Sequence, residues 1–419
     1  MTGTDGALAV VVREDWGRLL ALLVARFRRL DLAEDALGDA VEAAVRHWPV
    51  DGVPANPPAW LLTAARRRAL DRLRAEAVAA RAQPTLAVEA SLVVQARRVM
   101  ADGSGAGGGQ VGASDELLRL VLLCAHPSLA PADAAALTLR LVLGVSTADV
   151  ARLFLVPTPT MAARLTRARK RLAGCRFEVP TGPALLERLG TVADVAYLAF
   201  TAAYAPGSGD DVVRVGEAGE AVRLVRVVRD LSPVAVPDLD ALLALVLLQH
   251  SRRDARVRDG ALVLLPDQDR SRWHHDEVAE AVALLRPLVA EAPSTPYLLQ
   301  ALVAAEHALA PTAAATGWAR IARWYAELDD LTGSPVVRLN RAVAVAEAEG
   351  PEAGLALLEG LALGGHRLPA VRGELLARAG DVEAARAAYD DAMARCDNAA
   401  EADLLTRRRA GLSRPRPPG

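Results

Sequence analysis

The sequence predicts an all-α fold, on the basis of its composition and of the spacing of its apolar residues. Hydrophobic residues make up 52% of the chain and aromatic residues only 4%, so the cores must be built from Ala, Leu and Val. Such a composition favours helices. Along most of the 419 residues the apolar side chains recur at intervals of three and four, which gives each helix one buried face. The length predicts roughly three domains.

The first group of helices is expected within residues 13–80. The apolar periodicity places three helices there, at 15–30, 32–48 and 58–76. A further amphipathic stretch is predicted at 86–100 and is followed by ADGSGAGGGQVGAS. These small and turn-forming residues leave no face to bury, so we expect a mobile tether before the second group of helices.

The second group is predicted from the stretch that begins SDELLRLVLLCAH at residue 114. Helical patterns at 136–144 and 148–156 are separated by a short turn that starts after Gly144, and a basic helix follows at 160–172. This order is the layout of a helix-turn-helix module. Ser146 or Thr147, and Thr158, stand where helix N-caps are needed.

From about residue 180 the pattern becomes long, Ala- and Leu-rich and helical, without basic clusters. Two segments near the end, 339–361 and 371–393, are each predicted to form an antiparallel helix pair with a turn at Gly350 or Gly380. Repeated helix pairs are typical of tetratricopeptide-like domains, although the period here is shorter than usual. The tail SRPRPPG is expected to be disordered.

Two Arg-rich helices, within 59–76 and 157–174, are the most informative features. The net charge is −2, yet residues 160–176 carry six basic side chains and no acidic one. Uncompensated positive charge along a helix suits the phosphates of nucleic acid, whereas the plainer alternative is a solvated charged face. Two basic helices joined by a tether predict contact with nucleic acid at two separated places.

The candidate residues follow from the chemistry that each helix offers. In the helix within 59–76, an aromatic ring and a hydroxyl suit an unstacked base, and guanidinium groups suit phosphates. The alternative is that the arginines form a solvated helix face and that Trp60 belongs to the core. The candidates are Trp60, Thr63, Arg66, Arg67, Arg68 and Arg72. In the second, a polar N-terminal end suits base edges. The candidates are Thr158, Thr160, Arg164, Arg167, Arg169 and Lys170.

Acidic residues gather in the helix predicted at 32–48, above all Glu34, Asp35 and Asp39. Acid–base catalysis would need a histidine or a nucleophile nearby, and none is suggested, so a surface that binds a protein partner is favoured. His274 and His275 are the other candidate ligands, but adjacent residues of a helix diverge by about 100° and rarely share one metal ion. We therefore predict no metal site.

Other classes of function lack their signals. No phosphate-binding glycine loop, nucleophile elbow or zinc spacing occurs, so we expect no catalytic residue, no cofactor and no enzyme activity. Cys124, Cys175 and Cys396 are scattered and give no disulfide framework. The N-terminus lacks a basic leader and the longest apolar run is too short to span a membrane, which favours a cytoplasmic protein without membrane contact.

With these motifs the chain resembles an RNA polymerase sigma factor of the extracytoplasmic-function group, in the subgroup that carries a C-terminal tetratricopeptide-like extension. DLAEDALGDAVEAAVRHWP with NPPAWLLTAARRRALDRLR resembles sigma region 2, and the stretch from SDELLRLVLLCAH to RLTRARKRLA resembles region 4. Further on, DQDRSRW and TGSPVVRLNRAVAVAEAEGPEAGL resemble parts of the extension. The resemblance implies region 2 within 1–80, a flexible linker at 81–114, region 4 at 115–176, the extension at 180–412 and a disordered tail at 413–419.

The resemblance also implies a role for each candidate residue. The acidic helix with Glu34, Asp35 and Asp39 would bind core RNA polymerase. The first basic helix would melt and read the −10 promoter element, and the second would enter the major groove of the −35 element. The extension would regulate activity or bind a further protein. The alternatives from the residues alone are a one-component helix-turn-helix regulator with a helical sensor domain, and a helical-repeat adaptor with no role at DNA.

Overall fold

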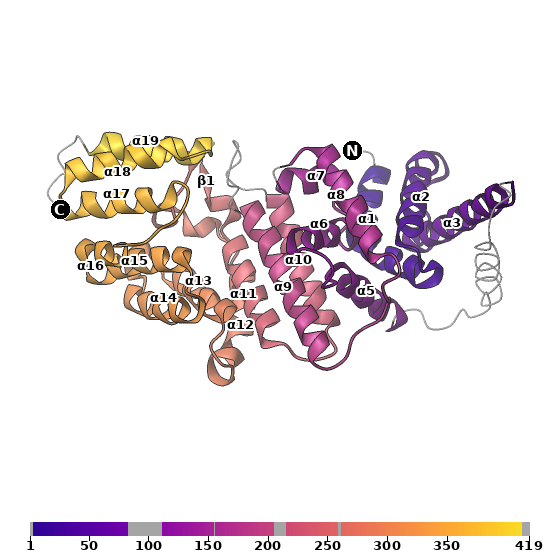
Figure 1. The fold of residues 1–419 in the computed structure, drawn as a ribbon, viewed down its shortest axis with the longest axis horizontal. Coiled ribbons are helices and arrows are strands. Elements are labelled where there is room, and N and C mark those ends of the chain that lie inside the picture. Colours follow the sequence, from indigo (N-terminus) through magenta and orange to yellow (C-terminus); the bar gives the residue numbers. More distant parts are fainter. Residues whose placement is uncertain (1–2, 83–110, 155, 205–214, 259–260, 413–419) are drawn as a thin grey trace. The chain divides into compact units, whose positions relative to one another are not determined.

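The computed structural model describes residues 3–82, 111–154, 156–204, 215–258 and 261–412 (Figure 1). The stretch predicted at 86–100, most of the predicted linker and the tail at 413–419 lie outside these residues. The all-α fold is confirmed. Among the described residues the β strands are limited to a short antiparallel pair, β1 (Val257–Arg258) with β2 (Ala261–Leu262).

The chain forms two compact units. Unit 1 contains residues 1–196 and 230–234, and unit 2 contains residues 197–229 and 235–419. The boundary between the two units at residues 196 and 197 falls inside a helix. It does not test the domain limits expected from the sequence, and those limits stay predictions. The helices that begin in unit 1 are α1 (Gly3–Phe27), α2 (Leu30–Asp51), α3 (Pro57–Ala82), α5 (Val111–Cys124), α6 (Pro131–Leu141), α7 (Thr147–Leu153), α8 (Thr158–Leu172) and α9 (Pro183–Tyr204).

Helices α1, α2 and α3 form a three-helix group around a Leu- and Ala-rich core. Leu20, Leu37 and Leu61, one from each helix, are fully buried. The chain turns between α2 and α3 at Gly52, whose φ of 84° is a conformation that suits a residue without a side chain. The three helices predicted in this region are therefore confirmed. Helices α2 and α3 extend beyond both predicted ends, whereas α1 begins earlier than predicted and ends three residues before the predicted end at residue 30.

Helices α6, α7 and α8 have the helix-turn-helix arrangement. Gly144 makes the turn with a φ of 72°, and the Ser146 hydroxyl caps α7 by accepting a hydrogen bond from the Asp149 amide at 3.1 Å. The expectation that Thr158 caps the last helix is wrong, because Thr158 is the first residue inside α8 and Pro157 stands at the cap. Proline suits this position, since it has no amide hydrogen to leave unpaired.

Among the described residues, the remaining helices begin in unit 2, which also contains four short 3-10 turns. The helices are α10 (Val215–Leu231), α11 (Pro237–His250), α12 (His275–Glu291), α13 (Pro296–Leu309), α14 (Trp318–Thr332), α15 (Pro335–Glu349), α16 (Pro351–Leu357), α17 (Arg367–Ala379), α18 (Val382–Ala394) and α19 (Ala399–Gly411). The turns are η1 (Arg253–Ala255), η2 (Leu265–Asp267), η3 (Arg270–Arg272) and η4 (Ala313–Ala315).

Helices α14 to α19 stack as consecutive antiparallel pairs (Figure 1). The predicted pairs are confirmed as α15 with α16 and α17 with α18, and their turns lie at Gly350 and Gly380, both with positive φ. Gly354 lets α16 approach α15 closely, because a Cβ atom there would lie 2.6 Å from the carbonyl oxygen of Ala342. A residue without a side chain thus sets the spacing between these two helices.

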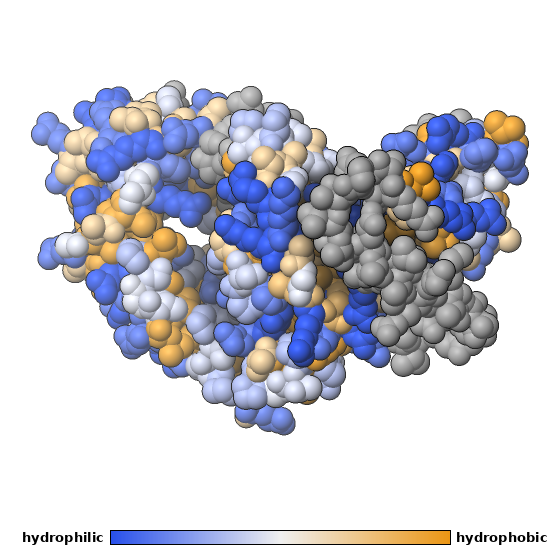
Figure 2. Space-filling view, turned by 45° about the vertical axis from the view of Figure 1, so that its right-hand side comes forward, coloured by the Kyte–Doolittle hydropathy of each residue, from blue (hydrophilic) through white to orange (hydrophobic). Residues whose placement is uncertain are grey.

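The surface of the molecule is mixed. On the face shown in Figure 2, hydrophilic residues predominate and smaller hydrophobic areas lie between them. None of the described helices combines the length and the apolar character needed to cross a membrane.

Candidate nucleic-acid interface

A hollow next to Trp60 is the most defined feature of the first basic helix, α3. It has a volume of about 320 Å³ and lies between the end of α2, the following loop and the start of α3. Trp48 lines the hollow and is buried, with its ring 5.7 Å from the ring of Trp60 in an edge-to-face arrangement. The lining residues are His47, Trp48, Asp51, Gly52, Val53, Pro54 and Trp60. An aromatic wall in an open hollow can stack on one unpaired base.

Sequence reasoning missed the contribution of α2 to this hollow. His47, Trp48 and Asp51 lie in its last turns, and they were not among the candidates. The signal was available, because two tryptophans bracket a Gly- and Pro-rich loop. Thr63 lies one turn beyond Trp60 and is exposed, and its hydroxyl donates a hydrogen bond to the carbonyl oxygen of Ala59.

The four candidate arginines of α3 have three different environments. Arg67 and Arg68 are exposed. Arg66 is half-buried, and burial together with the positive charge of Arg26 lowers its pKa. Arg72 is held by two carboxylates of α2, at 2.9 Å from Asp35 and 2.8 Å from Asp39. Arg67 and Arg68 are therefore the arginines of this set that are most open to a phosphate.

Helix α8 presents its candidate residues on two faces. Thr158, Thr160, Arg167 and Lys170 are exposed, and within the described residues neither Arg167 nor Lys170 forms an ion pair. Arg164 lies 3.5 Å from Asp133 of α6. Acidic residues of other helices therefore neutralise part of the positive charge within 160–176. The exposed face of α8 keeps the rest of that charge.

The acidic residues of α2 also divide into two environments. Asp35 and Asp39 bind Arg72, as described above; the Asp35 side chain is 66% exposed and the Asp39 side chain 35% exposed. Glu34 is only 7% exposed and has two partners from the helix-turn-helix module. Its Oε1 atom lies 2.9 Å from Nε of Arg140, and its Oε2 atom lies 2.7 Å from Nη2 of Arg169. Glu34, which was predicted to bind a protein partner, and Arg169, which was predicted to bind DNA, therefore form an ion pair with each other.

Packing around this ion pair joins α1 to the helix-turn-helix module. The guanidinium group of Arg140 lies over the ring of Trp16, 5.4 Å from its centre, and donates to the Val145 carbonyl oxygen. Gly144 packs on the same ring, since a Cβ atom there would lie 2.9 Å from Trp16 Cγ. Gly17 faces the backbone of Val142 so closely that a Cβ atom would overlap its carbonyl oxygen.

The two histidines near the start of α12 do not converge. His274 is half-buried and bonds to Asp254 at 2.7 Å and to Arg253 at 3.0 Å, whereas His275 is the first residue of α12 and is exposed. A group that sequence spacing did not reveal lies at the ends of α17, α18 and α19. Ligand atoms of His366, Cys396 and Glu401 lie within 4.8 Å of one another, and each already has a partner in the protein.

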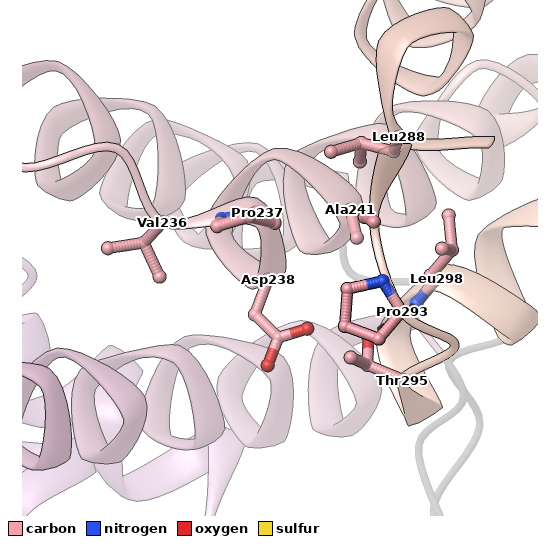
Figure 3. Close-up of a pocket in the computed structure, with 9 residues that line it drawn as sticks. Val236, Pro237, Asp238, Ala241, Leu288, Pro293, Thr295 and Leu298 are labelled. Atoms are coloured by element: carbon pink, nitrogen blue, oxygen red, sulfur yellow. Dashed lines mark hydrogen bonds between the residues drawn. The ribbon is translucent and has the colours of Figure 1, made fainter. Parts of the chain in front are cut away.

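Unit 2 also contains a cavity of about 200 Å³ where the start of α11 meets the end of α12 and the start of α13 (Figure 3). Its wall is mostly apolar, with Val236, Leu288 and Leu298 among the lining residues. Asp238 supplies the carboxylate seen in Figure 3, and within the described part of the chain its Oδ1 atom has no hydrogen-bond partner. The cavity can hold a small apolar group with a donor beside it.

Three family models match consecutive parts of the chain. Residues 12–78 match Sigma-70 region 2, residues 119–172 match Sigma-70, region 4, and residues 188–288 match a family of unknown function (DUF6596). The chain is 39% identical to an uncharacterized protein of Rhizobium meliloti (strain 1021) over 395 residues, which cover 92% of this chain and 91% of that protein. No solved structure matches the chain significantly.

Proposed function

The chain belongs to the sigma factors of the extracytoplasmic-function type that carry a C-terminal extension, and on this premise we propose that it binds core RNA polymerase, recognises −10 and −35 elements and helps to melt the promoter. Sigma regions 2 and 4 give it a role in promoter recognition, and such factors are DNA-binding proteins rather than enzymes. Work with the polymerase would place it in the cytoplasm.

The hollow at Trp60 is the observation that most directly supports the proposed role in promoter melting. A duplex hides the faces of its bases, so an aromatic hollow can be filled only by a base that has left the stack. Arg67 and Arg68 lie exposed on the same helix, about two turns further on, where they can bind the phosphates of the displaced strand. Trp60, Thr63, Arg66, Arg67, Arg68 and Arg72 thus remain our proposed −10 surface, with Trp48 and His47 added.

For the −35 element we propose the exposed face of α8. The N-terminal Thr158 and Thr160 offer hydroxyls to base edges, and Arg167 and Lys170 offer positive charge to phosphates. Arg164 and Arg169 must first exchange Asp133 and Glu34 for phosphate. We propose Glu34, Asp35 and Asp39 as contacts to core polymerase.

Run-off transcription with purified core polymerase tests the proposal. The full chain together with core enzyme should direct specific initiation, and the chain without core enzyme should bind the same duplex only weakly. Tight, specific binding to duplex DNA without core enzyme, with no initiation when core is added, would instead support the one-component regulator.

Exchange of Arg167 and Lys170 for alanine should weaken the binding of the holoenzyme to DNA at the −35 element. Each lost phosphate contact reduces the salt dependence of binding by about one unit of slope, without changing which sequence is preferred. Filter binding of the holoenzyme to promoter DNA at several salt concentrations measures this. Arg176→Ala is the matched control, because Arg176 is an exposed arginine just beyond α8. An unchanged slope in the double variant would remove α8 from the proposed DNA surface.

We further propose that the extension regulates initiation or binds a protein partner, to which the cavity beside Asp238 offers a site. A chain that ends at residue 204 keeps the Arg188 hydrogen bond to the Leu122 carbonyl oxygen, which holds the first part of α9 in unit 1. With core polymerase this shortened chain should give a changed run-off yield, after circular dichroism has confirmed that it is helical. Equal yields from both chains at every protein concentration would contradict a regulatory role in cis.

A further inference from the structure

Three side chains that can bind a metal ion converge where α17, α18 and α19 meet. His366 stands just before α17, Cys396 lies between α18 and α19, and Glu401 lies in the first turn of α19. Their ligand atoms lie within 4.8 Å of one another, and all three side chains are partly buried. The three residues belong to different elements, so only the fold brings them together.

Backbone and cap hydrogen bonds fix the positions of all three. Asn398 is buried and caps α19, and its side-chain oxygen accepts a hydrogen bond from the Glu401 amide at 3.1 Å. The Cys396 thiol donates to the carbonyl oxygen of Asn398 at 3.4 Å. His366 is the cap residue of α17, and its carbonyl oxygen accepts from the Ala370 amide at 3.0 Å. Groups held in this way lose little further freedom when they bind a ligand.

The distances suit a tetrahedral zinc ion. Zinc binds nitrogen and oxygen at about 2.0 to 2.1 Å, which places two such ligand atoms about 3.3 Å apart. The Nε2 atom of His366 lies 2.8 Å from the Oε2 atom of Glu401, so the two need to separate by only about 0.5 Å. The Cys396 sulfur lies within 4.8 Å of both atoms, and zinc would hold it about 3.6 Å from each. Small side-chain rotations are enough to reach this geometry.

The donor atoms and the charges favour zinc over harder cations. A thiolate sulfur, an imidazole nitrogen and a carboxylate oxygen are the ligand types that zinc takes in proteins, whereas calcium and magnesium prefer oxygen throughout. The negative charges of Glu401 and the exposed Asp397 both act on the Cys396 sulfur. A divalent cation at this point would be attracted by these charges.

Helix α19 forms two kinds of carboxylate contact. Toward its C-terminal end the ion pairs are formed by arginines, Arg408 with Glu374 and Arg409 with Asp390. A guanidinium group does not lose its proton in proteins and cannot be a metal ligand. Near the N-terminal end, Glu401 pairs instead with a histidine, which can give up a proton and then bind a metal ion.

We propose that His366, Cys396 and Glu401 bind one zinc ion, with a water molecule as the fourth ligand. On binding, the Cys396 thiol releases its proton and binds as a thiolate, and Nε2 of His366 gives up the proton that it donates to Glu401. The ion joins α17 to α19 and to the segment between α18 and α19, so it stabilises the packing of these helices. This site goes beyond the proposed sigma function and does not depend on it.

Cobalt is the first probe, because Co²⁺ accepts the same ligands and reports a thiolate ligand by its colour. The full chain is reduced with a phosphine, treated with EDTA and titrated with Co²⁺. One equivalent should produce a thiolate-to-cobalt charge-transfer band in the near ultraviolet and the intense visible bands of a tetrahedral site. Cys396→Ser should abolish the charge-transfer band. Cys175→Ser, which changes another partly buried cysteine, is the matched control and should keep it.

Calorimetric titration of the full chain with Zn²⁺ gives the affinity, and we expect one site per chain. His366→Gln, Cys396→Ser and Glu401→Gln each remove one ligand. Each should weaken zinc binding by about a hundredfold or more, since loss of an outer partner alone costs ten- to a hundredfold. His275→Gln changes an exposed histidine of the same unit and should bind zinc as the wild type does. Circular dichroism in EDTA confirms that each variant is helical.

Thermal unfolding gives a third readout. Zinc at a hundredfold excess over its Kd should raise the unfolding midpoint of unit 2 by roughly 5 to 10 °C in the wild type, and not in Cys396→Ser. A wild type that gives no charge-transfer band with Co²⁺ overturns the proposal, even where a variant fails to fold. So does a zinc affinity that is equal in the wild type and in all three ligand variants, because the ion would then be bound elsewhere.

Discussion

Trp60→Ala will reduce run-off transcription from a duplex promoter by about tenfold to a hundredfold. Stacking of one base on an aromatic side chain contributes about 1 to 3 kcal/mol, and that stabilisation is gained only after the base has left the duplex. The loss should therefore fall on formation of the open complex and leave the affinity for core polymerase unchanged. Permanganate footprinting of unpaired thymines, with run-off yield, measures it.

Trp60→Phe is the matched control for this prediction. Phenylalanine keeps an aromatic face in the hollow and should restore most of the run-off yield. Since Trp60 also contacts the buried Trp48, thermal unfolding of each variant separates a weaker fold from a lost base contact. A folded Trp60→Ala protein that opens the promoter as the wild type does would disprove the stacking role.

Acidification will destabilise unit 2 by about 2 kcal/mol between pH 7.5 and pH 5 through His307 alone. The pKa of His307 is lowered to about 4, mainly by burial. The positive charges of Arg252 and Arg270 lower it as well, whereas the negative charge of Glu306 raises it. The unfolded chain has a histidine pKa of about 6.5. Between these values the unfolded state binds more protons, so the stabilisation is present above pH 6.5 and is lost as the pH falls toward 4.

The His307 ring packs edge to face on Trp318, 5.1 Å between centres, so its protonation places a charge in an apolar contact. Calorimetry of the full chain at several pH values measures the effect, with hydrogen exchange in α13 to identify the transition of unit 2. His307→Gln cannot gain a proton and should be less sensitive to acid. If the stability of both proteins decreased equally as the pH is lowered, a group other than His307 would be responsible for the loss of stability.

Much of the fold could be predicted because it depends on local patterns. The spacing of apolar residues located α1 to α3, and glycines at 350 and 380 marked the turns of the helix pairs. Helix caps were harder. Thr158 has the right chemistry for a cap, but Pro157 precedes it and takes that place, since proline needs no hydrogen-bond partner for its nitrogen.

The candidate site could be predicted only in part, because charge along a helix says nothing about acids from elsewhere in the chain. Residues 160–176 contain no acid, yet Asp133 lies beside Arg164 and Glu34 beside Arg169. Both pairings are tertiary and cross at least 31 residues of sequence. Arg140 was missed, although a single arginine within the apolar run ALTLRLVLG already indicated a buried partner.

The double role of Glu34 has a consequence for genetic study of this protein. A substitution there removes a proposed polymerase contact and at the same time leaves Arg140 and Arg169 without the carboxylate that they share, so two different effects act on one measured output. We expect alleles of Glu34 to lower both the affinity for core polymerase and the stability of unit 1, so a transcription phenotype of such an allele does not by itself identify a polymerase contact. Thermal unfolding measured beside the affinity for core polymerase separates the two contributions of this residue.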